Sequence, residues 1–241
     1  MTLNGVYDIF NDKWEGQTAW IIADTHFGDK ELRAGFPDRP TDEELVKMIN
    51  SCAGRTDVLI LLGDVGDIKY VQQLRANYKI LICGNHDLGV SRYKRKTELK
   101  TYDSDLTLEE VSKKIIEDYP KYDRKIVNNG FLYDINYPGH YFWECYIDNH
   151  LFDEVYTGPL MIGEKLLLSH EPVDVSWAYN IHGHEHEGKM RTNHLNVCAD
   201  VLDYRPVNLN SFLSKSGALS KVETLHRQTI DKATRKKNVF K

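Results

Sequence analysis

Short apolar runs that end abruptly in polar residues are the main pattern along the chain. Runs of this length, bounded by polar turns, are typical of strands covered on both faces, although short buried helices produce the same pattern. Their β-branched residues and the glycines beside them favour strands. The runs are AWIIAD (19–24), DVLILLGD (57–64), YKILICGNHD (78–87), KLLLSHEP (165–172), YNIHGHEH (179–186) and HLNVCADV (194–201).

Segments with a helical pattern separate the first three runs. Residues 41–54, TDEELVKMINSCAG, have Thr41 and Glu44 in the spacing of a capping box and Gly54 as a stop signal. Residues 67–77 predict a second helix. The alternation of strand and helix predicts an α/β fold. Open α/β sheets collect their functional groups at the carboxyl ends of strands, which is where the polar residues of these runs fall.

Residues 91–164 differ from the rest and predict an excursion from this core. They begin with the basic run SRYKRKTELK, continue with a capped helix from Thr107 to about Asp118, and then become rich in tyrosine and aspartate. We therefore expect one domain over residues 1–241, in which 91–164 form an insertion that caps the functional site.

The composition is that of an ordinary globular protein. Of the 241 residues, 41% are hydrophobic and 28% are charged. No apolar run approaches the roughly 20 residues that span a bilayer, and the first residues lack the order of a signal peptide. The four cysteines lie far apart and form no CxxC pair, which favours a reducing compartment over a disulfide framework. We expect a cytoplasmic enzyme or binding protein with no membrane partner.

The C-terminal segment, residues 215–241, is a basic tail, although the chain as a whole has a net charge of −5. The tail holds eight lysines and arginines against Glu223 and Asp231, so the rest of the chain is acidic. A basic tail can contact nucleic acid, whereas a solvated chain end is the simpler interpretation.

The polar residues that end the runs are of types that bind metal ions. They combine carboxylates, an amide and imidazoles without a thiolate, which suits Zn²⁺, Mn²⁺ or Fe and argues against a pure Mg²⁺ or Ca²⁺ site. His182, His184 and His186 alternate, so an extended chain directs them to one side. Seven ligands are too many for one ion, but a bridging carboxylate lets them serve two. Each residue alone also has a structural interpretation: an aspartate can cap a helix, Asn85 can form a turn, and His170 can be a buried histidine.

The order of the motifs carries a family resemblance. DxH at 24–26, GD at 63–64, GNHD at 84–87, His170 and GHxH at 183–186 resemble the calcineurin-like metallophosphoesterase superfamily. ADTHFG and CADVLDYRPVNL further resemble a branch of small bacterial and phage phosphoesterases. The resemblance covers the core, about residues 18–90 and 165–210, and leaves the insertion and the basic tail unmatched. It implies a four-layer αββα sandwich, two mixed β-sheets flanked by helices, with the site at one edge.

The resemblance also implies a role for each residue. Water activated by two metal ions would attack phosphorus in line, and His86 would stabilise the transferring phosphoryl group or protonate the leaving oxygen. Asp67 would orient His86, whereas the role of His182 stays open. By motif position, Asp24, His26 and His186 hold the first metal ion, Asn85, His170 and His184 hold the second, and Asp64 bridges the two.

These expectations define a phosphoric ester hydrolase with two divalent metal ions, Mn²⁺ first and Zn²⁺ or Fe as alternatives. We expect a small phosphodiester substrate, with monoesters as an alternative, and the acidic core disfavours long nucleic acid. Protein phosphatases of the superfamily have an arginine where GDVGDIK has Ile68, and the DTHFG branch often has a histidine where this chain has Asp29. The remaining alternatives are a catalytically inactive scaffold of the same fold and a nuclease acting on nucleic-acid ends.

Overall fold

The computed structural model of the chain divides into two compact units. The first unit combines Met1–Arg92 with Phe152–Lys241, and the second is Tyr93–Leu151. Every predicted metal ligand belongs to the first unit. The residues that the structure describes are 17–87, 96–103, 105–118, 123–128, 142–149, 151–163, 165–189 and 191–222.

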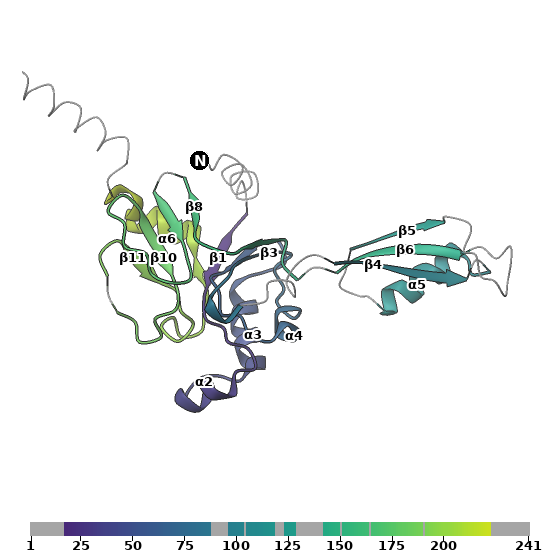
Figure 1. Ribbon diagram of the computed structural model, residues 1–241, viewed down its shortest axis with the longest axis horizontal. Helices are drawn as coiled ribbons and strands as arrows, with labels where there is room; N and C mark the ends of the chain where they lie inside the picture. The colour runs from purple at the N-terminus through teal and green to yellow at the C-terminus, as the bar shows by residue number, and fades with distance from the viewer. Residues whose placement is uncertain are drawn as a thin grey trace, which may run out of the picture. The chain divides into compact units, whose positions relative to one another are not determined.

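The first unit contains two mixed β-sheets (Figure 1). In the first sheet four strands are parallel, and β12 pairs antiparallel with β1. In the second sheet three strands are parallel, and β8 pairs antiparallel with β9. Each of the six apolar runs contains one of these strands, so the strand predictions are confirmed. In spatial order the first sheet is β12 (Val207–Asn208), β1 (Ala19–Ile22), β2 (Val58–Leu61), β3 (Tyr78–Ile82) and β7 (Glu154–Tyr156), and the second is β11 (His194–Asn196), β10 (Tyr179–His182), β9 (Leu166–Leu168) and β8 (Leu160–Ile162).

The two sheets share one hydrophobic core. Ile21 on β1 and Ile60 on β2 belong to the same buried cluster as Leu168 on β9 and Ile181 on β10. Successive side chains of a strand point to opposite faces, and the residues between these, such as Leu59, are also fully buried. The runs are apolar throughout because the first sheet is covered on both faces. Two mixed sheets with helices confirm the predicted α/β class, and the shared core is that of a sandwich.

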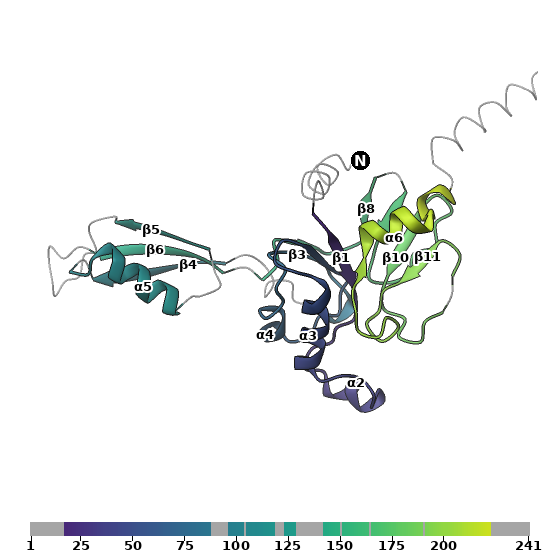
Figure 2. The ribbon, with the colours of Figure 1, turned by 180° about the vertical axis from the view of Figure 1, so that it is seen from behind.

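The helices of the first unit lie beside these sheets, except α2, which buries none of its residues. In both views α3 and α4 lie beside the first sheet (Figure 2). Helix α6 contacts β1 and β12, and its Phe212 packs against Tyr179 of β10. The capping box predicted for α3 is present: the side chain of Thr41 accepts from the N–H of Glu44, whose carboxylate accepts from the N–H of Thr41. The helices are α2 (Lys30–Gly35), α3 (Asp42–Cys52), α4 (Ile68–Val71) and α6 (Leu209–Ser216).

The helix predicted over residues 67–77 is shorter in the structure. Its helical part is α4, Ile68–Val71. Beyond it, the N–H of Leu74 bonds to the carbonyl of Val71, three residues back, so the chain tightens into a turn. The turn leads directly into β3, and this leaves no room for a longer helix.

The second unit is an antiparallel sheet with one helix. The helix, α5, buries Val111 and Ile115, and Thr107 caps it as predicted by accepting from the N–H of Glu110. The unit is narrower than the predicted insertion, residues 91–164, because β7 and β8 belong to the sheets of the first unit. Its role as a cap stays a prediction. Its elements are β4 (Lys96–Asp103), α5 (Leu108–Asp118), β5 (Asp123–Asn128) and β6 (Phe142–Asn149).

None of the helices in the described part of the chain is long and apolar enough to cross a membrane. The basic tail, residues 215–241, lies outside the described residues from position 223 onward.

Candidate metal centre

The predicted metal ligands lie just beyond the carboxyl ends of neighbouring strands. Asp24 follows β1, Asp64 follows β2 and Asn85 follows β3, while His170 follows β9 and His184 follows β10. Carboxyl ends of parallel strands meet at one edge of a sheet, so segments far apart in the sequence converge there. The backbone ties these segments together, since the N–H of Asp24 donates to Gly63 and that of His26 donates to Asp64.

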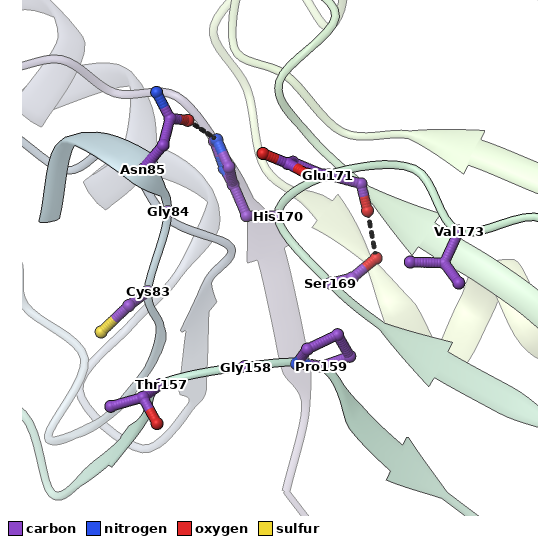
Figure 3. Close-up of a pocket in the computed structure, with 10 residues that line it drawn as sticks. All are labelled: Cys83, Gly84, Asn85, Thr157, Gly158, Pro159, Ser169, His170, Glu171 and Val173. Carbon is purple, nitrogen blue, oxygen red and sulfur yellow. Dashed lines mark hydrogen bonds between the residues drawn. The ribbon is translucent and has the colours of Figure 1, made fainter. Parts of the chain in front are cut away.

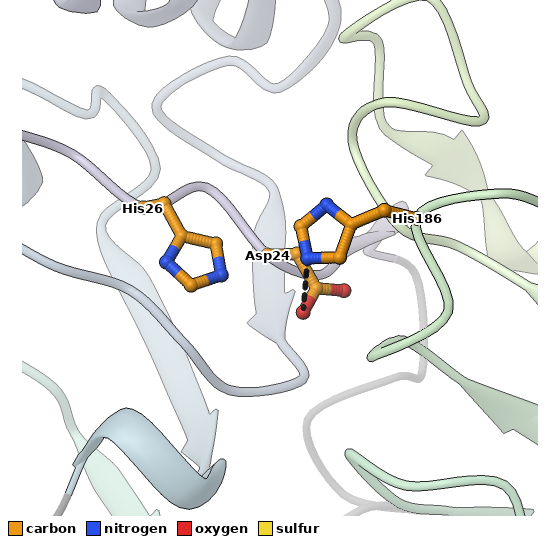
Figure 4. A group of neighbouring side chains, drawn as sticks. All are labelled: Asp24, His26 and His186. Atoms are coloured by element: carbon orange, nitrogen blue, oxygen red, sulfur yellow. Dashed lines mark ion pairs between the residues drawn. The ribbon is translucent and has the colours of Figure 1, made fainter. Parts of the chain in front are cut away.

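The first ligand group consists of Asp24, His26 and His186 (Figure 4). One ligand atom from each residue lies within 4.8 Å of the others. Asp24 Oδ1 is 4.0 Å from His186 Nε2, and Asp24 Oδ2 accepts from the N–H of His184 at 2.8 Å. The carboxylate of Asp24 therefore presents one oxygen to the site while the backbone holds the other.

The second ligand group consists of Asp64, His170 and His184, with ligand atoms again within 4.8 Å of one another. His170 Nε2 lies 3.2 Å from His184 Nδ1 and 2.8 Å from Asn85 Oδ1 (Figure 3). His170 Nδ1 lies 2.8 Å from the carbonyl of Leu62. This contact makes Nδ1 the donor and leaves Nε2 to face the group.

Asp64 lies between the two ligand groups. Its Oδ2 is 3.6 Å from His26 Nε2 in the first group and 3.3 Å from His170 Nε2 in the second. The structure therefore brings together all seven residues that the sequence predicts as ligands, with Asp64 in the shared position.

Two buried atoms of the first group test whether the site suits a cation. Asp24 Oδ1 and His26 Nε2 are buried and have no hydrogen-bond partner among the described residues. A buried carboxylate oxygen or ring nitrogen without a partner is costly. A divalent cation accepts electron pairs from both, so the residues fit a metal ion.

Burial and neighbouring charges shift the pKa of the ligands. Burial lowers the pKa of His26 to about 4, which leaves its imidazole neutral, and burial raises the pKa of the Asp24 carboxyl. Burial opposes the charged form of His170, but its hydrogen bond with Asp64 and the charges of Asp24 and Asp64 raise its pKa to about 9. A bound cation favours the deprotonated form of every one of these groups.

The backbone of the site is held in the left-handed region. Asp24, His26, Asp64 and His184 have φ values of 56°, 41°, 51° and 68°. Residues other than glycine rarely adopt this conformation, although Asp and His tolerate it better than most. Such strain persists where the surrounding structure overdetermines it, and it is concentrated at functional sites.

Two motif glycines leave room for the carboxylates. A Cβ at Gly84 would collide with the carboxylate of Asp64, and a Cβ at Gly183 would collide with that of Asp24. The glycines of GNHD and GHxH are therefore required because an aspartate of another motif lies against each one.

His86, predicted to act on the substrate, and Asp67, predicted to orient it, border the same pocket. His86 is exposed, its N–H donates to Asp64 Oδ1 at 2.8 Å, and its ring centroid is 5.3 Å from that of His26. Asp67 caps α4 by accepting from the N–H of Lys69, and pairs with the ammonium of Lys69 at 3.3 Å. That Asp67 orients His86 stays a prediction. We call this pocket of about 430 Å³ the acidic pocket; it is lined by His26, Phe27, Gly28, Asp29, Gly66, Asp67, Ile68 and His86.

Asp87, the last residue of GNHD, supports the site without being one of the predicted ligands. Its buried carboxylate accepts from the N–H groups of Asp64, Val65 and Gly84 at 2.8, 3.2 and 2.8 Å. It therefore joins the turn after β2 to the turn after β3. Its place in the motif was the available signal, but an aspartate in a turn usually bonds only to its own segment.

His182, whose role the sequence left open, is buried beside the site, and its Nε2 has no hydrogen-bond partner among the described residues. The side chain is fully buried, and its Nδ1 lies 2.8 Å from the carbonyl of Gly183. Its ring packs edge-on against His194, with centroids 5.2 Å apart.

Comparison with known proteins identifies the family. The family model for the calcineurin-like phosphoesterases matches residues 18–192, so the chain belongs to this family of metal-dependent phosphoric ester hydrolases. No curated protein matches the chain. Among solved structures, it is similar to the protein of unknown function AQ665 from Aquifex aeolicus, with 18% identity and a TM-score of 0.49 over 82% of this chain and 98% of that one.

Proposed function

We propose that the protein is a dinuclear phosphoesterase that hydrolyses small phosphodiesters and uses Mn²⁺. The observation that carries the proposal is the position of Asp64, whose Oδ2 faces a histidine of each ligand group. A carboxylate in that place can bridge two ions. Mn²⁺ suits the mixture of imidazole and oxygen donors, and Zn²⁺ and Fe remain the alternatives.

The residues divide the chemistry between them. Divalent ions at such a centre supply an activated water and neutralise charge on the phosphoryl oxygens. The buried ligands hold the centre rigidly, because Asp24 and Asp64 each use one oxygen to accept a backbone N–H. His86 is held to Asp64 by its own backbone, so its ring stays beside the centre without being a ligand.

His86 is the proposed proton donor to the leaving group. Its side chain is exposed and borders the acidic pocket, where a departing alcohol would lie. Protonation of the leaving oxygen by a positioned imidazole contributes on the order of 10²-fold or more to the rate.

Pockets on both flanks of the centre support a diester substrate. Beside the acidic pocket, a second pocket of about 210 Å³ borders the ligands Asn85 and His170 (Figure 3). A phosphodiester has two ester arms, and each pocket can receive one of them. We call this second pocket the apolar pocket; it is lined by Cys83, Gly84, Asn85, Thr157, Gly158, Pro159, Ser169, His170, Glu171 and Val173.

The charges around the centre favour a small substrate over nucleic acid. Asp29 and Asp67 line the acidic pocket, and Asp67 pairs with the ammonium of Lys69. A polynucleotide leaving group would bring further phosphates toward these carboxylates, and nucleic-acid binding depends on neutralising phosphates. A reducing, cytoplasmic location remains part of the proposal, in keeping with the free thiols of Cys52, Cys83 and Cys198.

The test compares a bis-aryl phosphodiester with the matching monoester. Protein stripped of metal is refilled with Mn²⁺, and turnover is measured for the natural chain and for His86→Ala. We expect activity that requires Mn²⁺ and favours the diester, with turnover lowered on the order of 10²-fold or more in the variant.

Metal content is the control, because His86 is not a proposed ligand. Both proteins should bind two Mn²⁺ per chain. If the chain binds no metal, the proposed metal centre does not exist and the proposal is wrong. Two bound ions with no turnover of either ester would favour an inactive scaffold, and preferential cleavage of nucleic-acid ends would favour a nuclease.

A further inference from the structure

A buried ion pair joins Arg39 to Asp200 beside the first ligand group. The residues are 161 positions apart in the sequence, and Arg39 Nη1 is 2.5 Å from both carboxylate oxygens of Asp200. Both side chains are 3% exposed. Neither residue is among the predicted metal ligands. A buried pair of this kind is seldom retained for stability alone, because desolvation offsets most of its attraction.

The same guanidinium holds the backbone that carries two ligands. Arg39 Nη2 donates to the carbonyl of Asp24 at 2.8 Å and to that of Thr25 at 2.7 Å. These carbonyls belong to the segment from Asp24 to His26, two of whose side chains enter the first ligand group. Arg39 thereby connects Asp200 to the strained turn after β1.

Asp200 in turn holds the third member of the group. Its Oδ2 lies 2.6 Å from His186 Nδ1, so Nδ1 carries the proton and Nε2 faces Asp24 Oδ1 at 4.0 Å. His170 is held in the same way by the carbonyl of Leu62. A hydrogen bond at the far nitrogen fixes the tautomer and ring direction of a metal-binding histidine.

Asp200 has a competing interpretation as a ligand. His186, Cys198 and Asp200 also bring ligand atoms within 4.8 Å of one another. However, both oxygens of Asp200 already accept from Arg39, and one also accepts from His186. Burial raises the pKa of the Cys198 thiol, which keeps it protonated. A cation would also have to sit beside a buried guanidinium. The contacts therefore favour support of a ligand over direct ligation.

We propose that Arg39 and Asp200 are positioning residues that assemble the first metal site from two distant segments. Asp200 directs His186 Nε2 into the site, and Arg39 holds Asp200 and the backbone of Asp24 in one arrangement. The inference rests on the proposed metal centre and adds residues to it that touch neither metal nor substrate.

The first test measures Mn²⁺ binding to metal-free protein by the electron paramagnetic resonance signal of free Mn²⁺. In Asp200→Asn, we expect one of the two ions to bind roughly ten- to a hundredfold more weakly, while the other ion is unaffected. Arg33→Gln is the matched control: it removes another arginine–aspartate pair, with Asp42, and should change neither affinity. Equal weakening of both ions in Asp200→Asn, in step with a lower melting temperature, would mean a purely structural role and overturn the proposal.

The second test uses the natural protein, so it can be carried out even if Asp200→Asn does not fold. Long-range ¹H–¹⁵N NMR of the metal-free natural protein, at a pH where imidazole is neutral, should show His186 protonated at Nδ1. Protonation at Nε2 would overturn the proposal even if metal binds normally. If the natural chain binds no Mn²⁺, the proposed function fails instead, and the tautomer still reports on Asp200.

Discussion

His170 must lose a proton before it can hold a metal ion. Its pKa in the metal-free protein is raised to about 9 from an ordinary value of 6.5, against the effect of burial, by Asp64 and Asp24. Between these values the folded chain binds more protons than the unfolded chain does. The stabilisation by the charged imidazole is therefore complete below pH 6.5 and is lost as the pH rises through about 9.

The expected result is a metal-free protein that loses stability above neutral pH. The contribution of His170 is at most about 3.5 kcal/mol, because the shift from 6.5 to about 9 is about 2.5 pKa units and one unit corresponds to about 1.4 kcal/mol. Urea unfolding at a series of pH values measures this contribution. In His170→Gln, the unfolding free energy should fall less steeply with pH between 6.5 and about 9. If the unfolding free energy of the variant falls with pH as steeply as that of the natural protein, groups other than His170 cause the loss of stability.

At the scale of residues, motif position predicted the members of the site but not their supports. Asp24, Asp64 and the histidines combine recognisable types with recognisable spacing. Asp87 and Arg39 act through contacts to segments distant in the sequence, and their own neighbours give no sign of these partners. Aspartate and arginine are common residues, so their types alone do not distinguish a support from a surface charge.

At the scale of elements, capping boxes start one helix in each unit. Thr41 and Glu44 begin α3, and Thr107 and Glu110 begin α5. Thr41→Ala should lower the unfolding free energy of the first unit by about 1 kcal/mol, because it leaves an N–H of the first turn without its partner. Thermal unfolding monitored by circular dichroism measures the change.

Two substitutions control for this effect. Thr41→Ser keeps the hydroxyl and should retain most of the stability. Thr107→Ala removes the matching cap from the second unit and should leave Mn²⁺ affinity unchanged. A loss of affinity in Thr107→Ala would mean that the metal centre depends on the second unit.

Elements were predictable where local signals agreed with the fold. The run around β2 is apolar and buried on both faces, and β1 and the last three residues of β3 are almost as fully buried. The helix over residues 67–77 was overestimated because its composition suits a helix, whereas the chain has to turn early to reach β3. The length of the connection between β2 and β3 depends on how the two strands pair in the sheet, and the sequence of residues 67–77 alone does not show that pairing.

At the scale of the whole molecule, the metal centre should be independent of the second unit. Every proposed ligand lies in the first unit. Replacing Tyr93–Leu151 with a flexible glycine–serine linker should therefore leave both Mn²⁺ affinities within about threefold of the natural values, as measured by the same Mn²⁺ titration. Loss of both ions in a folded variant would contradict this independence.

The same variant tests the predicted cap. If the second unit covers the site, its removal should change the ratio of diester to monoester turnover. If turnover of both substrates stays the same, the cap prediction is wrong. The sequence located an insertion but misplaced its end, because β7 and β8 lack the long apolar runs of the other strands and belong to the core through pairing with β3 and β9.

The left-handed backbone of Asp24, His26, Asp64 and His184 links this protein's lifetime to the metal supply of its cell. Such conformations cost on the order of 1 kcal/mol or more each, and bound ions would offset that cost because they bind the folded chain more tightly than the unfolded chain. When metal is scarce, a larger fraction of molecules is unfolded and open to proteases. Metal starvation should then lower the abundance of the protein as well as its catalytic activity. The cell would lose the protein when too little metal is present to fill its site.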